Sequence, residues 1–229
     1  MKRRRFPLKP RRFAGKSRQN PAENVFFWLQ VGAFVFLSRP FFWLGISFAA
    51  LLIFYFLFFN AALLAIILLP NLWSFYLHAA FSIGNNYRIK IKKSFDFLLF
   101  LIQSIFALAV YFLFYLLHFL DNLEWQNLTQ IFTLFFLKFL VLFLVAVLFF
   151  ALFSFPPFLM RKHKMDIFWA IQSSITAVFK NYKAFAILFI FMGILFFIGI
   201  LTAGVAFLVV LPILAGTFFA AYNDIFEGV

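Results

Sequence analysis

The sequence predicts an all-α polytopic membrane protein with about six transmembrane helices in three hairpins and two interfacial amphipathic helices. Of its 229 residues 66% are hydrophobic, whereas an ordinary soluble domain has about 45–50%. Only 20 basic and 7 acidic residues are present, and they cluster between long uncharged runs. These runs match the ~20 apolar residues that a helix needs to cross a bilayer. A soluble monomer is therefore excluded.

Residues 1–20 form a basic arm that precedes the membrane domain, residues 21–229. The arm holds nine of the 20 lysines and arginines and no acid. Because such a segment cannot bury a core, we expect it to be disordered or to lie on a membrane surface. Anionic lipid is the nearest partner, since each base close to an anionic membrane contributes about 1 kcal/mol. Nucleic-acid binding is not expected, because the arm has no specificity element.

The first helix is expected over residues 21–38. Asn20-Pro21-Ala22-Glu23 is typical of a helix start, with Asn as the N-cap and Pro at the first helical position. The apolar part, residues 25–37, is closed by Ser38-Arg39-Pro40. This part is too short to span about 30 Å of hydrocarbon. We therefore expect the helix to lie in the membrane interface.

Four transmembrane helices follow in the sequence. Residues 41–83 contain no charged side chain, which is twice the length of one span, and we divide this run at Asn60. Pro156-Pro157 ends the last of the four. The four predicted spans are residues 41–59, 61–83, 95–119 and 131–155.

Residues 165–182 predict a second interfacial helix. Apolar side chains such as Ile167, Ile171 and Ile175 recur at helical spacing, whereas polar ones such as Gln172 and Lys180 point elsewhere. This pattern is typical of an amphipathic helix on a membrane surface. The uncharged run that follows is long enough for two more spans, which we expect over 184–201 and 204–224.

The distribution of charge predicts the orientation of the chain. With six spans, 19 of the 20 basic residues lie on the side of both termini. The loop 121–130 on the other side carries two acids and no base. The positive-inside rule then places both termini in the cytoplasm, and we expect a multi-pass protein of a bacterial inner membrane.

A weak internal repeat relates the two ends of the chain. Three short matches recur in the same order at an offset of 141 or 142 residues: Phe27-Trp28 with Phe168-Trp169, Leu69-Pro70 with Leu211-Pro212, and Ala79-Ala80 with Ala220-Ala221. We expect parallel repeats, each an interfacial helix followed by a hairpin. Pro70 and Pro212 are predicted helix-kink positions, each followed four residues later by a small residue. Such kinks serve either ordinary packing or a gate.

Several of these residues also carry a resemblance to a known family. The motifs are Lys180-Asn181-Tyr182, Leu211-Pro212, Gly216 and residues 220–226, with Phe27-Trp28, residues 40–43 and Pro70 in the first half. The chain resembles an uncharacterised family of small bacterial inner-membrane proteins. That family is distantly similar to the membrane domain of some glycerophosphoryl diester phosphodiesterases. The resemblance implies a helical membrane protein of a Gram-negative bacterium, but no established activity.

The sequence offers no candidate catalytic, cofactor-binding or metal-binding residues. It has no cysteine, and His78, His118 and His163 lack the i, i+4 spacing of a helical metal site. We interpret His78 and His118 as interfacial and His163 as solvated. Asp224 and Glu227 are expected to form surface ion pairs with the basic loops or with Arg39. An enzyme is therefore not expected.

Three polar residues within the predicted spans are candidate polar or lipid contacts, namely Gln103, Ser104 and Lys138. A charge at membrane depth is costly and indicates a function by default, although Lys138 lies close enough to a helix end to snorkel. Our first hypothesis is a non-enzymatic inner-membrane protein with an accessory or envelope-organising role. The alternative is a small transporter, channel or lipid-handling protein, which requires these polar residues to converge on a hydrated path.

Overall fold

The computed structural model describes residues 23–60, 62–85, 97–119, 137, 140–141, 144–145 and 147–227. Within these residues the chain is helical and has no strand. In chain order the helices are α1 (Asn24–Ser38), α2 (Pro40–Asn60), α3 (Ala62–Gly84), α4 (Phe97–Phe119), α6 (Pro156–His163), α7 (Ile167–Lys180), α8 (Tyr182–Leu201), α9 (Phe207–Tyr222) and a π-helical turn, Asn223–Glu227. The basic arm, the loop 121–130 and Lys138 lie outside the described residues.

Two of the described helices are long and apolar enough to cross a membrane. They are Tyr182–Gly199 in α8 and Phe207–Glu227, which joins α9 to the π-helical turn. The pair α1 and α2 would make a third candidate, with a bend of 92° between its halves. The predicted spans 61–83, 95–119 and 131–155 include residues outside the described ones, so the number six stays a prediction.

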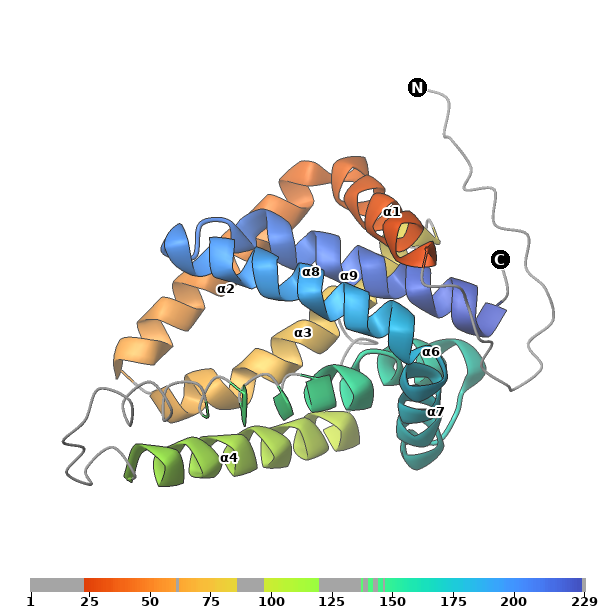
Figure 1. Ribbon diagram of the computed structural model, residues 1–229. Helices are drawn as coiled ribbons and strands as arrows, with labels where there is room; N and C mark the ends of the chain where they lie inside the picture. Colours follow the sequence, from red (N-terminus) through yellow and green to blue (C-terminus); the bar gives the residue numbers. More distant parts are fainter. Residues whose placement is uncertain are drawn as a thin grey trace.

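Helix α9 is the central element of the fold. It packs against α1, α2, α3 and α8, and Figure 1 shows it running between them. In the apolar stretch that contains α9, 72% of the residues are buried, against 33% in that of α8. Since α9 is covered on several sides and α8 only partly, α8 is the one of these two that presents a free apolar face.

Close packing of glycines lets α1 lie along α9. A methyl group added at Gly32 would lie 2.5 Å from the carbonyl oxygen of Ile213 and 2.8 Å from the amide nitrogen of Thr217. A methyl group at Gly216 would lie 2.8 Å from Cα of Gly32. All three distances are shorter than van der Waals contact allows, so only glycine permits this approach. Gly216, the small residue four positions after Pro212, thus lets α1 pack closely against α9.

The break between α1 and α2 has a local cause in Ser38-Arg39-Pro40. Arg39 N–H donates to the carbonyl of Phe36 at 3.2 Å, so the carbonyl of Val35 loses its expected helical partner. That carbonyl accepts hydrogen bonds from Ser38 Oγ at 2.7 Å and from Trp43 Nε1 at 3.1 Å instead. The Trp43 indole therefore joins the first turn of α2 to the end of α1 across the bend.

A tight turn joins α8 to α9 over residues 202–206. Gly204 has φ +89° and Ala203 has φ +48°, both in the left-handed region. Thr202 Oγ1 accepts a hydrogen bond from the amide of Ala206 at 3.0 Å. Tyr55 Oη donates a hydrogen bond to the carbonyl of Ala203 at 2.6 Å. Helix α2 thereby reaches the α8–α9 turn. In Figure 1 the α2–α3 and α8–α9 turns lie at the same end of the molecule.

Aromatic rings fill the centre between α3, α8, α9 and the helical segment that ends at residue 153. Phe150 and Phe218 are stacked, with ring centroids 5.4 Å apart and planes 8° apart. Trp73 meets both rings edge-on at 5.5 and 5.6 Å, and Phe185 stacks on Phe218. Such aromatic pairs contribute about 0.5–1.5 kcal/mol each beyond the area they bury. The phenylalanines therefore build the core as well as the outer faces.

We predict that Gly32→Ala and Gly216→Ala each destabilise the fold. The added methyl group has no room at either position, and overpacking of this kind costs about 1–3 kcal/mol. Gly193→Ala in α8 is the matched control, because nothing lies within 4 Å of the added methyl group there. Reversible unfolding in mixed micelles measures the difference. Equal stability of all three variants would contradict the close approach of α1 to α9.

Candidate functional site

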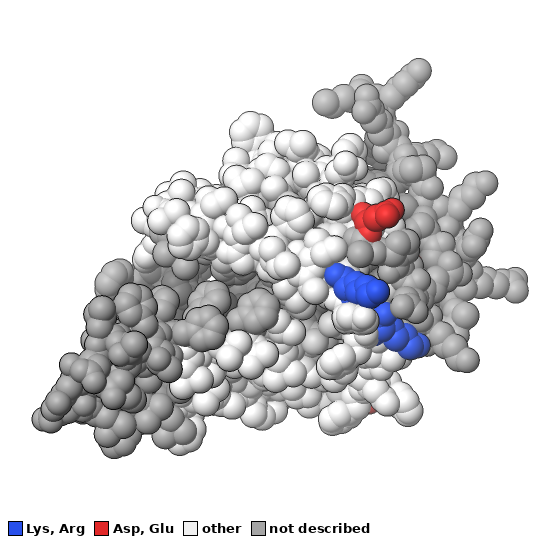
Figure 2. Space-filling view, viewed as in Figure 1, with Lys and Arg blue, Asp and Glu red and all other residues white. Residues whose placement is uncertain are grey.

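The described charged residues, apart from Arg39, belong to one end of the molecule. This end comprises the start of α1, α6, α7, the start of α8 and the end of α9 (Figure 1). On the face in Figure 2 the blue and red atoms gather at this end, and the described surface away from it is white. We call it the charged end. Its polar contacts are the only concentration of ionisable side chains among the described residues, so they form the candidate site.

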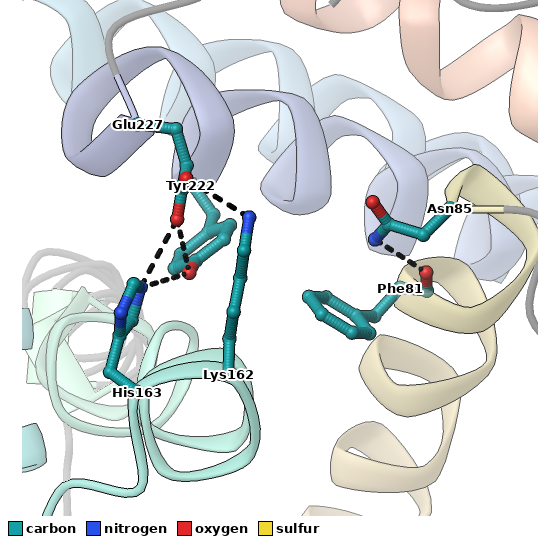
Figure 3. A network of polar contacts seen from close by, with 6 residues as sticks. All are labelled: Phe81, Asn85, Lys162, His163, Tyr222 and Glu227. Atoms are coloured by element: carbon teal, nitrogen blue, oxygen red, sulfur yellow. Dashed lines mark hydrogen bonds and ion pairs between the residues drawn. The ribbon is translucent and has the colours of Figure 1, made fainter. Parts of the chain in front are cut away.

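Glu227 is the centre of the first group of contacts (Figure 3). Its Oε1 accepts a hydrogen bond from Tyr222 Oη at 3.0 Å and lies 3.1 Å from His163 Nε2. Its Oε2 forms an ion pair with Lys162 Nζ at 3.0 Å. Because Tyr222 Oη donates to the carboxylate, it accepts from His163 Nε2 at 2.7 Å, which places a proton on that nitrogen. The group joins the end of α9 to the end of α6.

A π-helical turn makes this geometry possible. Tyr222 and Glu227 are five residues apart, and in an α-helix residues at that spacing point to different sides. The wider turn over residues 223–227 brings positions i and i+5 into line. The tyrosine hydroxyl therefore reaches the glutamate of the next turn, and Glu227 is only 6% exposed.

Arg161 joins α6 to α3. Its Nη1 lies 2.7 Å from Nε2 of His78 and donates to Ser82 Oγ at 3.0 Å. Its guanidinium carbon lies 5.1 Å from the centroid of the Phe81 ring, a distance at which a cation is attracted to the ring face. Adjacent residues of α6 thus contact two different helices: Arg161 contacts α3, and Lys162 contacts the end of α9.

Asp224 holds the start of α1 against the end of α9. Its Oδ2 accepts hydrogen bonds from Asn24 Nδ2 and from the Trp28 indole, both at 2.8 Å. Glu23 at the N-cap position makes no side-chain hydrogen bond to α1. A carboxylate near a helix N-terminus is stabilised by the helix dipole. Asp224, which lies near the C-terminal end of the sequence, therefore supplies the negative charge that stabilises the start of α1.

Two interpretations from the sequence are wrong at this end. His163 is not solvated, because Tyr222 and Glu227 cover it and its side chain is 12% exposed. Glu227 does pair with a basic segment, but it is buried and not a surface acid. The sequence does carry one signal for this site, since two acids three residues apart end an otherwise uncharged run.

The candidate polar residues of the predicted spans do not form one group within the described chain. Gln103 is fully buried and donates from Nε2 to Ser74 Oγ at 2.7 Å, which joins α4 to α3. Its Oε1 has no hydrogen-bond partner among the described residues. Ser104 Oγ donates to the carbonyl of Phe100 on its own helix at 2.8 Å. Lys138 lies outside the described residues.

The two predicted kink positions lie inside helices, Pro70 in α3 and Pro212 in α9. The residues four positions later differ in role. Gly216 permits the approach of α1, whereas Ser74 accepts the hydrogen bond from Gln103. The equivalent positions of the two hairpins therefore meet different helices.

Asp224 and Glu227 are engaged in contacts that hold helices together. In the part of the chain that the structure describes, no three histidine, aspartate or glutamate side chains are close enough to hold a metal ion. What the arrangement can do chemically is bind together α1, α3, α6 and α9 at one end of the molecule.

Comparisons of the chain with protein-family models, with curated proteins and with solved structures found no match. The resemblance to small bacterial inner-membrane proteins therefore remains an expectation from the sequence.

We predict that Asp224→Ala destabilises the fold by about 1–3 kcal/mol, because it leaves the buried Trp28 indole without an acceptor. Asp224→Asn keeps an acceptor oxygen and should cost less. Glu23→Ala removes an exposed acid at the same end and is the control, with an expected change within about 0.5 kcal/mol. Thermal unfolding in nanodiscs measures all three. If Asp224→Ala unfolds at the temperature of Glu23→Ala, Asp224 does not hold α1.

Proposed function

We propose that the protein is a non-enzymatic integral membrane protein with an accessory or envelope-organising role in a bacterial inner membrane. It would cross the membrane six times as three hairpins, with both termini in the cytoplasm. Membrane lipids would be its immediate surroundings, with anionic lipid at the basic arm.

The exposed faces of the helices support the membrane setting. Large apolar side chains are exposed along α2, α4 and α8: Phe48, Ile53 and Phe56; Leu101, Ile105 and Phe112; Ile190, Ile194 and Phe197. A soluble monomer rarely exposes contiguous apolar patches of more than a few hundred Å². A lipid environment removes the cost of this exposure.

The exposed tyrosines support a bilayer that lies between the two ends. Tyr182 is exposed at the charged end, where α8 begins. Tyr55 is exposed beside the α8–α9 turn at the other end, and Tyr111 and Tyr115 are exposed in the second half of α4. Tyrosine is enriched at both membrane–water interfaces. The charged end would then be the cytoplasmic one.

The order of elements supports the internal repeat. An amphipathic or short helix followed by a hairpin occurs as α1–α2–α3 and again as α7–α8–α9. Each hairpin carries its proline in the returning helix. The copies would have diverged in packing, since α1 lies along α9 whereas α7 packs against α6 and α8.

The single observation that carries the non-transporting role is the filled aromatic centre. Phe218 contacts the rings of Trp73, Phe150 and Phe185 where a substrate path would need polar side chains. Gln103 is fully buried and pairs with Ser74. Such a core suits a rigid membrane-embedded scaffold.

We predict that the interior near Ser74 is closed to water-soluble reagents. The chain has no cysteine, so single cysteines can be introduced without background labelling. In intact vesicles Ser74→Cys should react with a charged maleimide at least about tenfold more slowly than the exposed control Lys180→Cys, because access limits the thiol. Both should react fully after denaturation in detergent.

Labelling of Ser74→Cys at the rate of Lys180→Cys would contradict the closed interior. It would favour the alternative function, a small transporter, channel or lipid-handling protein with a hydrated path between α3 and α4.

A further inference from the structure

Helix α7 has one face against the rest of the protein and two different exposed faces. The buried face consists of side chains at helical spacing: Ile167, Ala170, Ser174, Ala177 and Val178. Ser174 Oγ donates to the carbonyl of Ala151 at 2.6 Å, which fixes the rotation of α7 about its axis. The directions of its other side chains are therefore determined.

The first exposed face is apolar and aromatic. Phe168 and Phe179 are 70% and 71% exposed, and Ile175, half-buried, lies between them at spacings of seven and four residues. Residues at these spacings share one side of a helix. Tyr182, 59% exposed, follows at the start of α8. We call these residues the aromatic face.

The second exposed face is polar. Thr176 and Lys180, four residues apart, are exposed on it, and the exposed Gln172 lies at its border with the aromatic face. Trp169 is also exposed on this side, and its indole suits the zone of lipid headgroups, where tryptophan is enriched. A helix with a buried, an aromatic and a polar face is suited to a boundary among protein, lipid and water.

The connection to α8 puts this boundary at the membrane surface. A single residue, Asn181, separates α7 from the candidate span that begins at Tyr182. Figure 1 shows α7 running across the axis of α8 at the charged end. If α8 crosses the bilayer, α7 lies along its surface.

We propose that α7 and the first turn of α8 are a docking surface for anionic phospholipid. This inference rests on the proposed membrane setting. The aromatic face enters the acyl-chain boundary, and the exposed amines of Lys180 and Lys183 contact lipid phosphates beside it. Lys164 is exposed just before the other end of α7 and adds a third positive charge. The exposed Asp166, two residues later, is the acid at that end. This lipid site is distinct from the basic arm.

Two observations favour lipid over a soluble protein as the occupant. The aromatic face belongs to a helix that ends one residue before a candidate span, so if that span crosses the bilayer the face lies next to lipid. Bases outnumber acids at its border, as an anionic leaflet requires.

The test uses the full chain in nanodiscs of phosphatidylcholine and phosphatidylglycerol, with spin labels at single cysteines. Phe179→Cys should be more accessible to oxygen, which concentrates in lipid, than to a water-soluble nickel complex. Thr176→Cys on the polar face should show the reverse order. Phe197→Cys on the exposed side of α8 is the lipid-facing reference.

The outcomes separate this inference from the membrane setting itself. If Phe197→Cys is oxygen-accessible but Phe179→Cys favours the nickel complex, α7 lies in water and the docking surface is wrong. If Phe179→Cys is protected from both reagents, another protein covers the face, which also overturns the proposal. If Phe197→Cys favours the nickel complex, the membrane setting fails first.

The charge contribution is tested by the phosphatidylglycerol that remains bound after purification. Lys180→Gln and Lys183→Gln should each lower its affinity about fivefold, as expected for one base near an anionic surface. Arg39→Gln, an exposed base at the α1–α2 bend, is the matched control and should change little. An equal loss in Arg39→Gln, or no loss in the other two, would contradict a specific site at α7.

Discussion

The burial of α9 is the constraint on which the rest of the structure depends. A largely apolar helix covered by α1, α2, α3 and α8 needs neighbours that approach closely and fill the space between them. Gly32 of α1 contacts Gly216 of α9, and the Phe218 ring of α9 stacks with Phe150 in the centre. Without the hydrophobic effect inside a bilayer, such packing is the main force between helices.

The charged end follows from the same constraint. Once α9 ends there, its last turn must leave the apolar interior, and two acids three residues apart give it partners on two sides. Asp224 contacts α1, and Glu227 contacts α6. Segments from opposite ends of the sequence are therefore joined at one place. The chain that leaves α6 leads after three residues into α7. The lipid-facing position that we propose for α7 depends on this arrangement.

Local sequence signals predicted where the chain turns. Ser38-Arg39-Pro40 stands where α1 gives way to α2, and the turn expected near Thr202 separates α8 from α9. The sequence predicts these positions because Pro, Gly and charged residues affect the backbone conformation and membrane depth of the residues next to them. The amphipathic pattern of 165–182 was readable for the same reason, since helical spacing is a local property.

Local sequence signals do not predict which helices pack against each other. Helix α1, expected as an interfacial amphipathic helix, is apolar on nearly all sides and packs against α9. Its sequence therefore does not show which face meets α9, and the partner of Gly32 is 184 positions away. His163 was interpreted as solvated because its sequence neighbours are basic, whereas its partners Tyr222 and Glu227 come from the far end of the chain. The π-helical turn that aligns those two residues leaves no pattern in hydropathy.

Cross-linking of the two ends tests most directly the claim that α1 lies along α9. Asn24 Nδ2 and Asp224 Oδ2 are 2.8 Å apart, so a short bifunctional thiol reagent should join Asn24→Cys to Asp224→Cys within one chain in membranes. The pair Asn24→Cys and Asn60→Cys should stay unlinked, because the start of α1 and the end of α2 lie at opposite ends of the molecule in Figure 1. Failure of the first pair to cross-link, or equal yields for both pairs, would contradict a fold built around α9.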